Sequence, residues 1–154
     1  MTLAASILLA FLAGSIPFGF IIGRARGIDI RKHGSGNIGA TNVGRVLGRR
    51  LGLLCFALDV LKGLAPTLAY GLWAGHAGTI LLEPLDAWRW LAVMSAPVLG
   101  HMFCPWVGFK GGKGVATGLG ALLGVYPVLT IAGVGALAAW LLALRLWRMV
   151  SAAS

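Results

Sequence analysis

Charged side chains are scarce in this chain, and acidic ones most of all. Among 154 residues only four are Asp or Glu and 13 are Lys or Arg, whereas 58% are apolar. A water-soluble fold of this length needs a larger polar shell around its core. The composition therefore excludes an ordinary soluble protein and predicts that residues 1–154 form a single membrane-embedded domain.

Cysteine is scarce as well. The two cysteines, Cys55 and Cys104, fall in different apolar segments that are not expected to meet. Neither belongs to a sequence cluster of cysteine, histidine or carboxylate residues. The sequence therefore predicts no disulfide framework and no metal site.

Long apolar runs are what the sequence has instead. Four of them approach or exceed the roughly 20 residues that a helix needs to cross about 30 Å of hydrocarbon. These runs are Leu3–Gly23, Leu51–Trp73, Trp90–Val107 and Val115–Leu144. The first lacks the basic amino end of a signal peptide and is longer than a signal core. We therefore expect it to be a mature helix that includes Pro17.

The last run is long for one helix and short for two. Pro127 lies inside it, and an interior proline removes a backbone hydrogen bond and kinks or ends a helix. We therefore expect a break there, with a short fourth helix before it and a fifth helix after it. The predicted fold class is all-α, a polytopic membrane bundle of about five transmembrane helices.

The basic residues are placed asymmetrically. The segment between the first two runs holds one acid, Asp29, against Arg24, Arg26, Arg31, Lys32, Arg45, Arg49 and Arg50. Lys110 and Lys113 follow the third run, and Arg145 and Arg148 lie near the end. By the positive-inside rule these segments face the cytoplasm and the amino terminus lies outside. We expect a multi-pass protein of the bacterial inner membrane that binds no nucleic acid, despite its net charge of +9.

The first polar cluster runs from Asp29 to Arg45, where glycines alternate with small hydroxyl and amide residues. Such a segment lets several backbone N–H groups turn toward one anion, and Arg45 can make paired contacts to phosphate. The candidate phosphate-binding residues are Gly34, Ser35, Gly36, Asn37, Thr41 and Asn42. The Gly34–Gly39 pattern also fits a dinucleotide fingerprint, but that pattern needs a parallel sheet. The plain alternative is a basic loop that touches anionic lipid headgroups.

The second polar cluster lies inside an apolar run. Charge is costly there and indicates a functional site by default. Asp59 and Lys62 are three residues apart, so on a helix they share a face and can neutralise each other. Two interpretations stay open: an ion pair that only locks helices together, or a site where Lys62 or the backbone near Gly63 reaches an anionic substrate.

The third polar cluster holds the glycine-rich loop 111–114. It resembles a nucleotide phosphate loop, but Val107 and Gly114 stand where the Walker A motif requires Gly and Ser or Thr. What the loop retains is Gly111 and Gly112, Lys113 as a point charge, and a following helix whose amino end favours anions. His101, just before the loop, is either a hydrogen-bonded structural residue or a base.

Together these segments closely resemble the motifs of the bacterial acyl-phosphate:glycerol-3-phosphate acyltransferases, the PlsY family. The matching stretches, in family order and spacing, are Gly14–Gly19, Gly34–Arg45, Asp59–Gly63, Gly100–Phe103 and Phe109–Thr117. The resemblance implies transfer of an acyl group from fatty acyl phosphate to the 1-hydroxyl of glycerol 3-phosphate. The products would be lysophosphatidic acid and phosphate, in the first step of phospholipid synthesis. It implies no metal, no coenzyme A or other cofactor, and no partners beyond these substrates and membrane lipids.

The resemblance also implies two sets of site residues. The catalytic set is Ser35, Arg45, His101 and Lys113. The set that binds substrate or phosphate is Gly34, Gly36, Asn37, Thr41, Asn42, Lys62, Gly63, Gly111 and Gly112. The group that takes the hydroxyl proton stays open between a substrate phosphate and His101. An acyl-Ser35 intermediate lacks a base at short spacing.

Family members usually continue for some dozens of residues beyond the position of Ser154, so the resemblance implies a chain shortened at its carboxyl end. An acyltransferase of the His-x-x-x-x-Asp type is excluded, because no Asp stands five residues after any histidine. A transporter or binding protein for organic phosphates is the alternative from another class. A transporter exposes its site to both membrane faces, whereas all three polar clusters are expected to face the cytoplasm.

Overall fold

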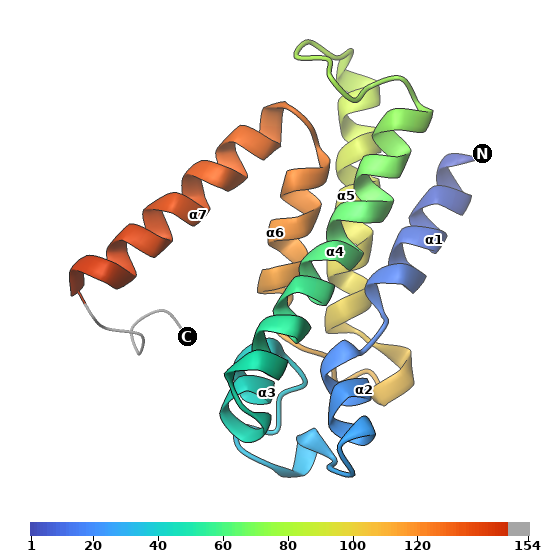
Figure 1. The fold of residues 1–154 in the computed structure, drawn as a ribbon. Helices are drawn as coiled ribbons and strands as arrows, with labels where there is room; N and C mark the ends of the chain where they lie inside the picture. The colour runs from blue at the N-terminus through green and yellow to red at the C-terminus, as the bar shows by residue number, and fades with distance from the viewer. Residues whose placement is uncertain (148–154) are drawn as a thin grey trace.

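The computed structural model describes residues 1–147, with side chains described through residue 142. Within this range the chain forms helices and connecting turns and no strand (Figure 1). The α-helices are α1 (Leu3–Gly14), α2 (Phe18–Ala25), α3 (Ala40–Leu47), α4 (Arg49–Trp73), α5 (Pro84–Met102), α6 (Val115–Gly124) and α7 (Val128–Trp147). Two 3-10 turns, η1 (Ile30–Lys32) and η2 (Pro105–Val107), lie between them. The all-α prediction is confirmed for the described residues.

Three apolar segments are long enough to cross a membrane, and these are Leu3–Ala25, Arg49–Trp73 and Pro84–Val107. The second agrees with the predicted helix. The third begins before the expected Trp90, because Pro84 takes the first helical position, where the missing N–H of proline has no cost. Its α-helix ends at Met102, before turn η2.

The first of these segments is interrupted, contrary to expectation. α1 ends at Gly14 and α2 begins at Phe18, so that Ser15–Pro17 separates them. Pro17 has no N–H to donate to the preceding turn, and its ring disfavours helical geometry in the residue before it. The prediction of one helix that includes Pro17 is therefore wrong, and the carbonyl groups freed at this break need other partners.

The last apolar run is broken as predicted. α6 ends at Gly124 and α7 begins at Val128, with Pro127 between them. α6 has ten residues, or about 15 Å of helix, which is half the thickness of the hydrocarbon core. α6 and α7 run in opposite directions (Figure 1). The side chain of Arg145 and the whole of Arg148 lie outside the described residues.

Glycines bring α4 and α6 close together. A Cβ added at Gly63 would collide with the carbonyl oxygen of Thr117, and one at Gly120 would collide with that of Val60. Small residues of this kind let membrane helices approach closely. Gly63 therefore has a packing role, whereas the sequence interpretation placed it at a substrate.

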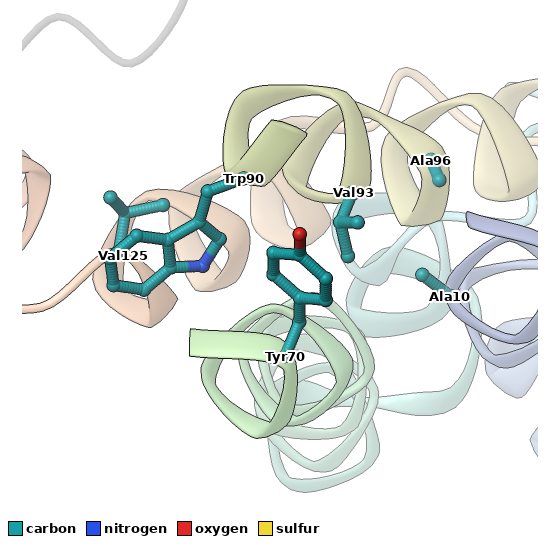
Figure 2. Packing of buried hydrophobic residues seen from close by; sticks show 6 residues of the cluster. All are labelled: Ala10, Tyr70, Trp90, Val93, Ala96 and Val125. Atoms are coloured by element: carbon teal, nitrogen blue, oxygen red, sulfur yellow. The ribbon is translucent and has the colours of Figure 1, made fainter. Parts of the chain in front are cut away.

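A buried apolar cluster joins α1, α4, α5 and the end of α6. It consists of Ala10, Tyr70, Trp90, Val93, Ala96 and Val125 (Figure 2). Trp90 is 1% exposed, and its indole N–H donates to the carbonyl of Thr67 at 2.9 Å. Its ring lies against Gly71, where a Cβ would collide with it. This cluster fixes the helices relative to one another in the half of the bundle nearer the amino terminus.

The two ends of the bundle differ in charge. The amino terminus and the α4–α5 connection lie at one end, which we call the amino-terminal end (Figure 1). The opposite end carries the segment from α2 to α4 and the α5–α6 connection (Figure 1). We call it the cationic end, since it holds Arg24, Arg26, Arg31, Lys32, Arg45, Arg49, Arg50, Lys110 and Lys113. The two glycine-rich connections therefore lie on the same side of the bundle.

Candidate active site

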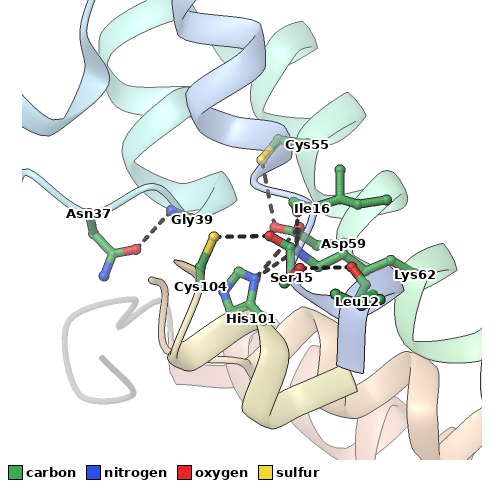
Figure 3. A network of polar contacts seen from close by, with 10 residues as sticks. All are labelled: Leu12, Ser15, Ile16, Asn37, Gly39, Cys55, Asp59, Lys62, His101 and Cys104. Carbon is green, nitrogen blue, oxygen red and sulfur yellow. Dashed lines mark hydrogen bonds and ion pairs between the residues drawn. The ribbon is translucent and has the colours of Figure 1, made fainter. Parts of the chain in front are cut away.

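Side chains from distant parts of the chain form hydrogen bonds with the polar groups at the break between α1 and α2 (Figure 3). The Ser15 hydroxyl donates to the carbonyl of Leu12 at 2.8 Å and accepts the indole N–H of Trp106 at 2.8 Å. The Cys104 thiol donates to the Ser15 carbonyl at 2.9 Å, and the Lys62 ammonium donates to the next carbonyl, that of Ile16, at 2.7 Å. Unsatisfied carbonyls are costly in a membrane, so these contacts stabilise the broken conformation.

An ionic cluster of Asp59, Lys62 and His101 lies next to this break (Figure 3). Lys62 Nζ is 2.7 Å from Asp59 Oδ1 and 2.8 Å from His101 Nδ1. The ion pair is close, although its angles do not make Asp59 Oδ1 a hydrogen-bond acceptor. Its Oδ2 accepts the thiol of Cys55 at 3.7 Å. All three members of the cluster are buried, at 2%, 5% and 4% exposed respectively.

This burial changes the expected roles of Lys62 and His101. The buried Lys62 ammonium contacts Asp59, His101 and the Ile16 carbonyl, whereas the sequence interpretation had it bind glycerol 3-phosphate. On His101, Nδ1 faces Lys62, and the ring lies against Gly112. Of the two interpretations of the Asp59–Lys62 pair, the structure favours the buried ion pair, which lies within α4 and contacts its neighbours through the Lys62 ammonium.

Asn42 organises the first polar cluster from the inside. It is 2% exposed, and its Oδ1 accepts the backbone N–H of Ser35 at 2.9 Å. Its Nδ2 group lies within hydrogen-bond distance of the carbonyls of Ile30, His33 and Asn37, at 3.3, 3.1 and 2.8 Å. Because the whole amide is occupied by the protein, Asn42 shapes the cluster, whereas the sequence interpretation had it bind phosphate.

The rest of this cluster forms a turn that leads into α3. Gly34 and Gly36 have φ of +60° and +72°, in the left-handed region that favours glycine. The side-chain oxygen of Asn37 accepts the N–H of Gly39 at 2.8 Å, so this N–H is not free for an anion. No side chain caps the amino end of α3, and the side chain of Thr41 in its first turn is exposed.

The third polar cluster is built against His101. The N–H groups of Gly111 and Gly112 donate to the carbonyls of Met102 and His101 at 3.1 and 3.2 Å. A Cβ at Gly111 would collide with the His101 carbonyl, and one at Gly112 would collide with Nε2 of the His101 ring. The loop leads directly into α6, as predicted, and no side chain caps the amino end of that helix. Lys113, which precedes it, is exposed.

Electrostatics distinguish the basic residues of the cationic end. Asp29 pairs with Arg31 at 2.8 Å and with Arg24 at 3.4 Å. The hydrogen bond from the Arg31 side chain holds the pKa of the Asp29 carboxyl well below its usual range, so this acid stays ionised and partly neutralises its neighbours. Among the described side chains, the other bases of this end, Arg45 and Lys113 included, pair with no carboxylate. Arg45 and Lys113 are both exposed and accessible to a ligand.

The two cysteines belong to one buried cluster of the cationic end, together with Ile30, Ile38, Val43 and Val107. The expectation that their segments stay apart is therefore wrong, because the α5–α6 connection folds back against the base of α4. Both thiols are free. Within the described residues no three His, Cys, Asp or Glu side chains gather as metal ligands.

A groove of about 380 Å³ opens beside the helix break. It is lined by Leu12, Ile16, Pro17, Phe20, Ile21 and Trp106. The lining is almost wholly apolar, so an oily surface adjoins the polar contacts of Ser15 and Lys62. Sequence inspection singled out Lys62 but missed Ser15, Cys104 and Trp106 at the break, and the signal that could have pointed to them was Pro17 inside an apolar run.

Comparison with known proteins identifies the family to which the chain belongs. The family model described as glycerol-3-phosphate acyltransferase matches residues 4–154. A glycerol-3-phosphate acyltransferase of Trichlorobacter lovleyi is 48% identical over 146 residues, which cover 94% of this chain and 68% of the relative. The chain belongs to the glycerol-3-phosphate acyltransferase family. A relative with the same description in Synechococcus elongatus is 46% identical and aligns with 100% of this chain and 71% of its own.

Solved structures agree with this family assignment. The crystal structure of PlsY, an integral membrane glycerol 3-phosphate acyltransferase, in its glycerol 3-phosphate form is 40% identical with a TM-score of 0.81. The match covers 96% of this acyltransferase chain and 67% of PlsY. The lysophosphatidic acid form of PlsY is 39% identical with a TM-score of 0.77 and is covered to 65%. The chain thus spans about two thirds of the length of these relatives and is an integral membrane protein like them.

Proposed function

We propose that this protein transfers a fatty acyl group from acyl phosphate to the 1-hydroxyl of glycerol 3-phosphate. The products are lysophosphatidic acid and inorganic phosphate. Family membership supports this activity, as do the two forms of PlsY, whose descriptions name glycerol 3-phosphate and lysophosphatidic acid. Residues 1–154 act as one membrane-embedded acyltransferase domain.

The observation that carries the proposal is the pairing of two anion-binding features at the cationic end. The amino ends of α3 and α6 both lack a side-chain cap, and each helix amino end carries about half a positive charge. Arg45, in the last turn of α3, and Lys113, just before α6, add two cations that pair with no carboxylate among the described side chains. Two such features suit a reaction between two phosphorylated molecules better than a site for a single anion does.

The polar surface of the cationic end and the apolar groove beside the helix break suit two substrates of different polarity. Glycerol 3-phosphate is soluble and would bind at the exposed side chains of Ser35 and Thr41 beside the amino end of α3, with Arg45 reaching it from the last turn of that helix. The acyl phosphate is oily, and its chain fits the apolar groove beside the helix break. Its phosphate would lie against Lys113 and the amino end of α6.

The chemistry requires little beyond positioning and charge stabilisation, because an acyl phosphate is already an activated mixed anhydride. The 1-hydroxyl oxygen attacks the acyl carbonyl carbon and forms the new ester bond. The bond between that carbon and the phosphate oxygen then breaks, and the phosphate leaves with the electron pair. Lys113 stabilises the negative charge that develops on the carbonyl oxygen and on the leaving phosphate.

The hydroxyl proton passes to a substrate phosphate in this proposal. His101 is the protein's other candidate base, but it is 4% exposed and its Nδ1 lies 2.8 Å from the Lys62 ammonium. A general base has to be within about 3 Å of the proton it takes. The imidazole is therefore assigned no proton-transfer step.

We also propose that the protein resides in the bacterial inner membrane with its cationic end toward the cytoplasm, following the positive-inside rule. The test is labelling of Ser35→Cys and Lys113→Cys variants in intact cells and in inverted vesicles. Both positions should react with a membrane-impermeant reagent in inverted vesicles only. Reaction of the two positions from opposite sides would rule out a shared site.

The activity itself is tested with the full chain purified in detergent. Palmitoyl phosphate and glycerol 3-phosphate together should give phosphate release and lysophosphatidic acid, and omission of glycerol 3-phosphate should leave only slow hydrolysis. Uptake of glycerol 3-phosphate into vesicles without any lysophosphatidic acid would identify a transporter and overturn the proposal.

A further inference from the structure

The cluster of Asp59, Lys62 and His101 has no part in the reaction as proposed above, yet its charged groups are buried. Taking two charges out of water is costly, and their mutual attraction barely offsets that cost. Such a pair adds little net stability to a membrane bundle. Its presence calls for a different explanation, and its neighbours supply one.

Lys62 joins three segments that lie far apart in the sequence. It is on α4, it bonds the carbonyl of Ile16 at the α1–α2 break, and it contacts Nδ1 of His101 near the end of α5, 39 residues away. The ammonium also lies 5.6 Å from the centre of the Phe18 ring at the start of α2. One side chain therefore fixes the break in the first span relative to the end of the third (Figure 3).

His101 passes this constraint on to the glycine-rich loop. One side of its imidazole is held by Lys62, and its Nε2 side lies so close to Gly112 that no Cβ fits between them. The carbonyl of His101 accepts the N–H of Gly112 at 3.2 Å. The loop is thus anchored on both the ring and the backbone of His101, and the residue after this anchor is Lys113.

We propose that Asp59, Lys62 and His101 are positioning residues, which set the place of Lys113 through the contact between His101 and Gly112 without touching substrate. The inference rests on the proposed function, because it assigns Lys113 to the reacting acyl phosphate. Asp59 holds the Lys62 side chain in place from 2.7 Å, and Lys62 fixes the ring plane of His101. The glycine-rich loop then needs no side chain of its own to hold its shape.

The first test removes both charges together. Lys62→Met alone would leave the Asp59 carboxylate buried without a cation and would destabilise the fold strongly. The pair Asp59→Asn/Lys62→Met leaves no unpaired charge and keeps the side chains close in size. With the loop free to move, kcat should fall at least tenfold while the KM for glycerol 3-phosphate stays within twofold. A rise in KM with unchanged kcat would mean that Lys62 binds the substrate, and would overturn the inference.

A double-mutant cycle separates positioning from a general structural effect. If the pair acts through Lys113, the same two substitutions should cause no further loss of activity in a Lys113→Ala background, because coupled residues are not additive. Equal fold losses in both backgrounds would contradict the inference. The wild-type chain is assayed beside these variants, so absence of acyl transfer in the wild type would refute the proposed function instead.

A nitroxide label reports the loop directly. Cys55 and Cys104 are both buried. A thiol-reactive label should therefore attach selectively to the cysteine of a Lys110→Cys variant, since the side chain at position 110 is exposed. The label should become more mobile in the Asp59→Asn/Lys62→Met background, and an unchanged spectrum would contradict the inference.

The contact is also tested from the loop side, which keeps the inference falsifiable if the double substitution fails to fold. Gly112→Ala should lower kcat and loosen the label at position 110, since its methyl group displaces the His101 ring. Gly118→Ala is the matched control, because nothing lies within 4 Å of a Cβ at that position. Normal kcat in Gly112→Ala would show that the contact does not position Lys113.

Discussion

The two ends of this bundle use polar groups in opposite ways. At the amino-terminal end, the buried cluster around Trp90 is apolar apart from single hydrogen bonds such as that to the Thr67 carbonyl. At the cationic end, buried Asp59, Lys62, His101 and Asn42 each make several polar contacts. One end is built for stability and the other holds a particular backbone shape. Substitutions at the two ends should therefore affect different measurements.

The largest expected loss of stability is at the amino-terminal end. Trp90→Ala removes a ring that is 1% exposed and should lower the free energy of unfolding by about 3–5 kcal/mol. Turnover per folded molecule should stay close to normal. Unfolding in detergent measures the free energy of unfolding, and phosphate release measures turnover. Trp88→Ala on the same helix is the control, since Trp88 is 71% exposed. A loss of turnover without a loss of stability in Trp90→Ala would contradict the distinction between the two ends.

The largest expected loss of activity is at the cationic end. Arg45→Ala and Lys113→Ala should each lower kcat/KM by about 100-fold or more, equivalent to about 2.7 kcal/mol of transition-state stabilisation. The melting temperature should hardly change, because both side chains are exposed. Arg89→Ala serves as the control, since Arg89 is an exposed base in the other half of the bundle that pairs with Asp86. Near-normal turnover in both test variants would refute the site assignment.

Asn42→Ala should affect both measurements. The substitution removes the amide that organises the Ser35 turn and leaves buried backbone groups without partners, at about 1–3 kcal/mol for each group left unsatisfied. Activity should fall with it, because the Ser35 and Thr41 side chains are no longer held in place. If stability fell while kcat/KM stayed normal, the turn would have no part in substrate binding.

The smallest expected effect is that of a surface ion pair. Asp86 and Arg89 are 3.0 Å apart and both partly exposed, and such pairs contribute about 0–1 kcal/mol. Asp86→Ala should therefore shift the melting temperature only slightly, and less in high salt. A large shift would mean that charge also stabilises the amino-terminal end, and the contrast between the ends would be weaker than proposed.

Local rules predicted most of the helices. Hydrophobic length alone placed α4 within two residues of its observed start at Arg49, and the cost of an interior proline placed the break at Pro127. The same rule applied to Pro17, but the length of the surrounding apolar run suggested a continuous helix. The break forms there because Lys62 and Cys104 accommodate its carbonyls, and no local pattern contains that information.

The candidate site was predicted by residue type more successfully than by role. The sequence singled out Asn42, Lys62 and His101 as polar residues in unusual places, and all three are buried at the cationic end. Whether a buried amide or ammonium faces a ligand or the protein depends on contacts across tens of residues. Such contacts follow from the tertiary fold and not from spacing, so their roles required the structure.

The interrupted first span has a consequence for biogenesis. When residues 1–25 enter the bilayer, the side chains of Lys62 and Cys104, which bond the carbonyls of Ile16 and Ser15, have not yet reached it. Until they arrive, these carbonyls need water or the insertion machinery as temporary partners, because lipid offers none. The interrupted first span therefore reaches its final shape only after the third span has been inserted, so the last step of its folding comes late in the assembly of the protein.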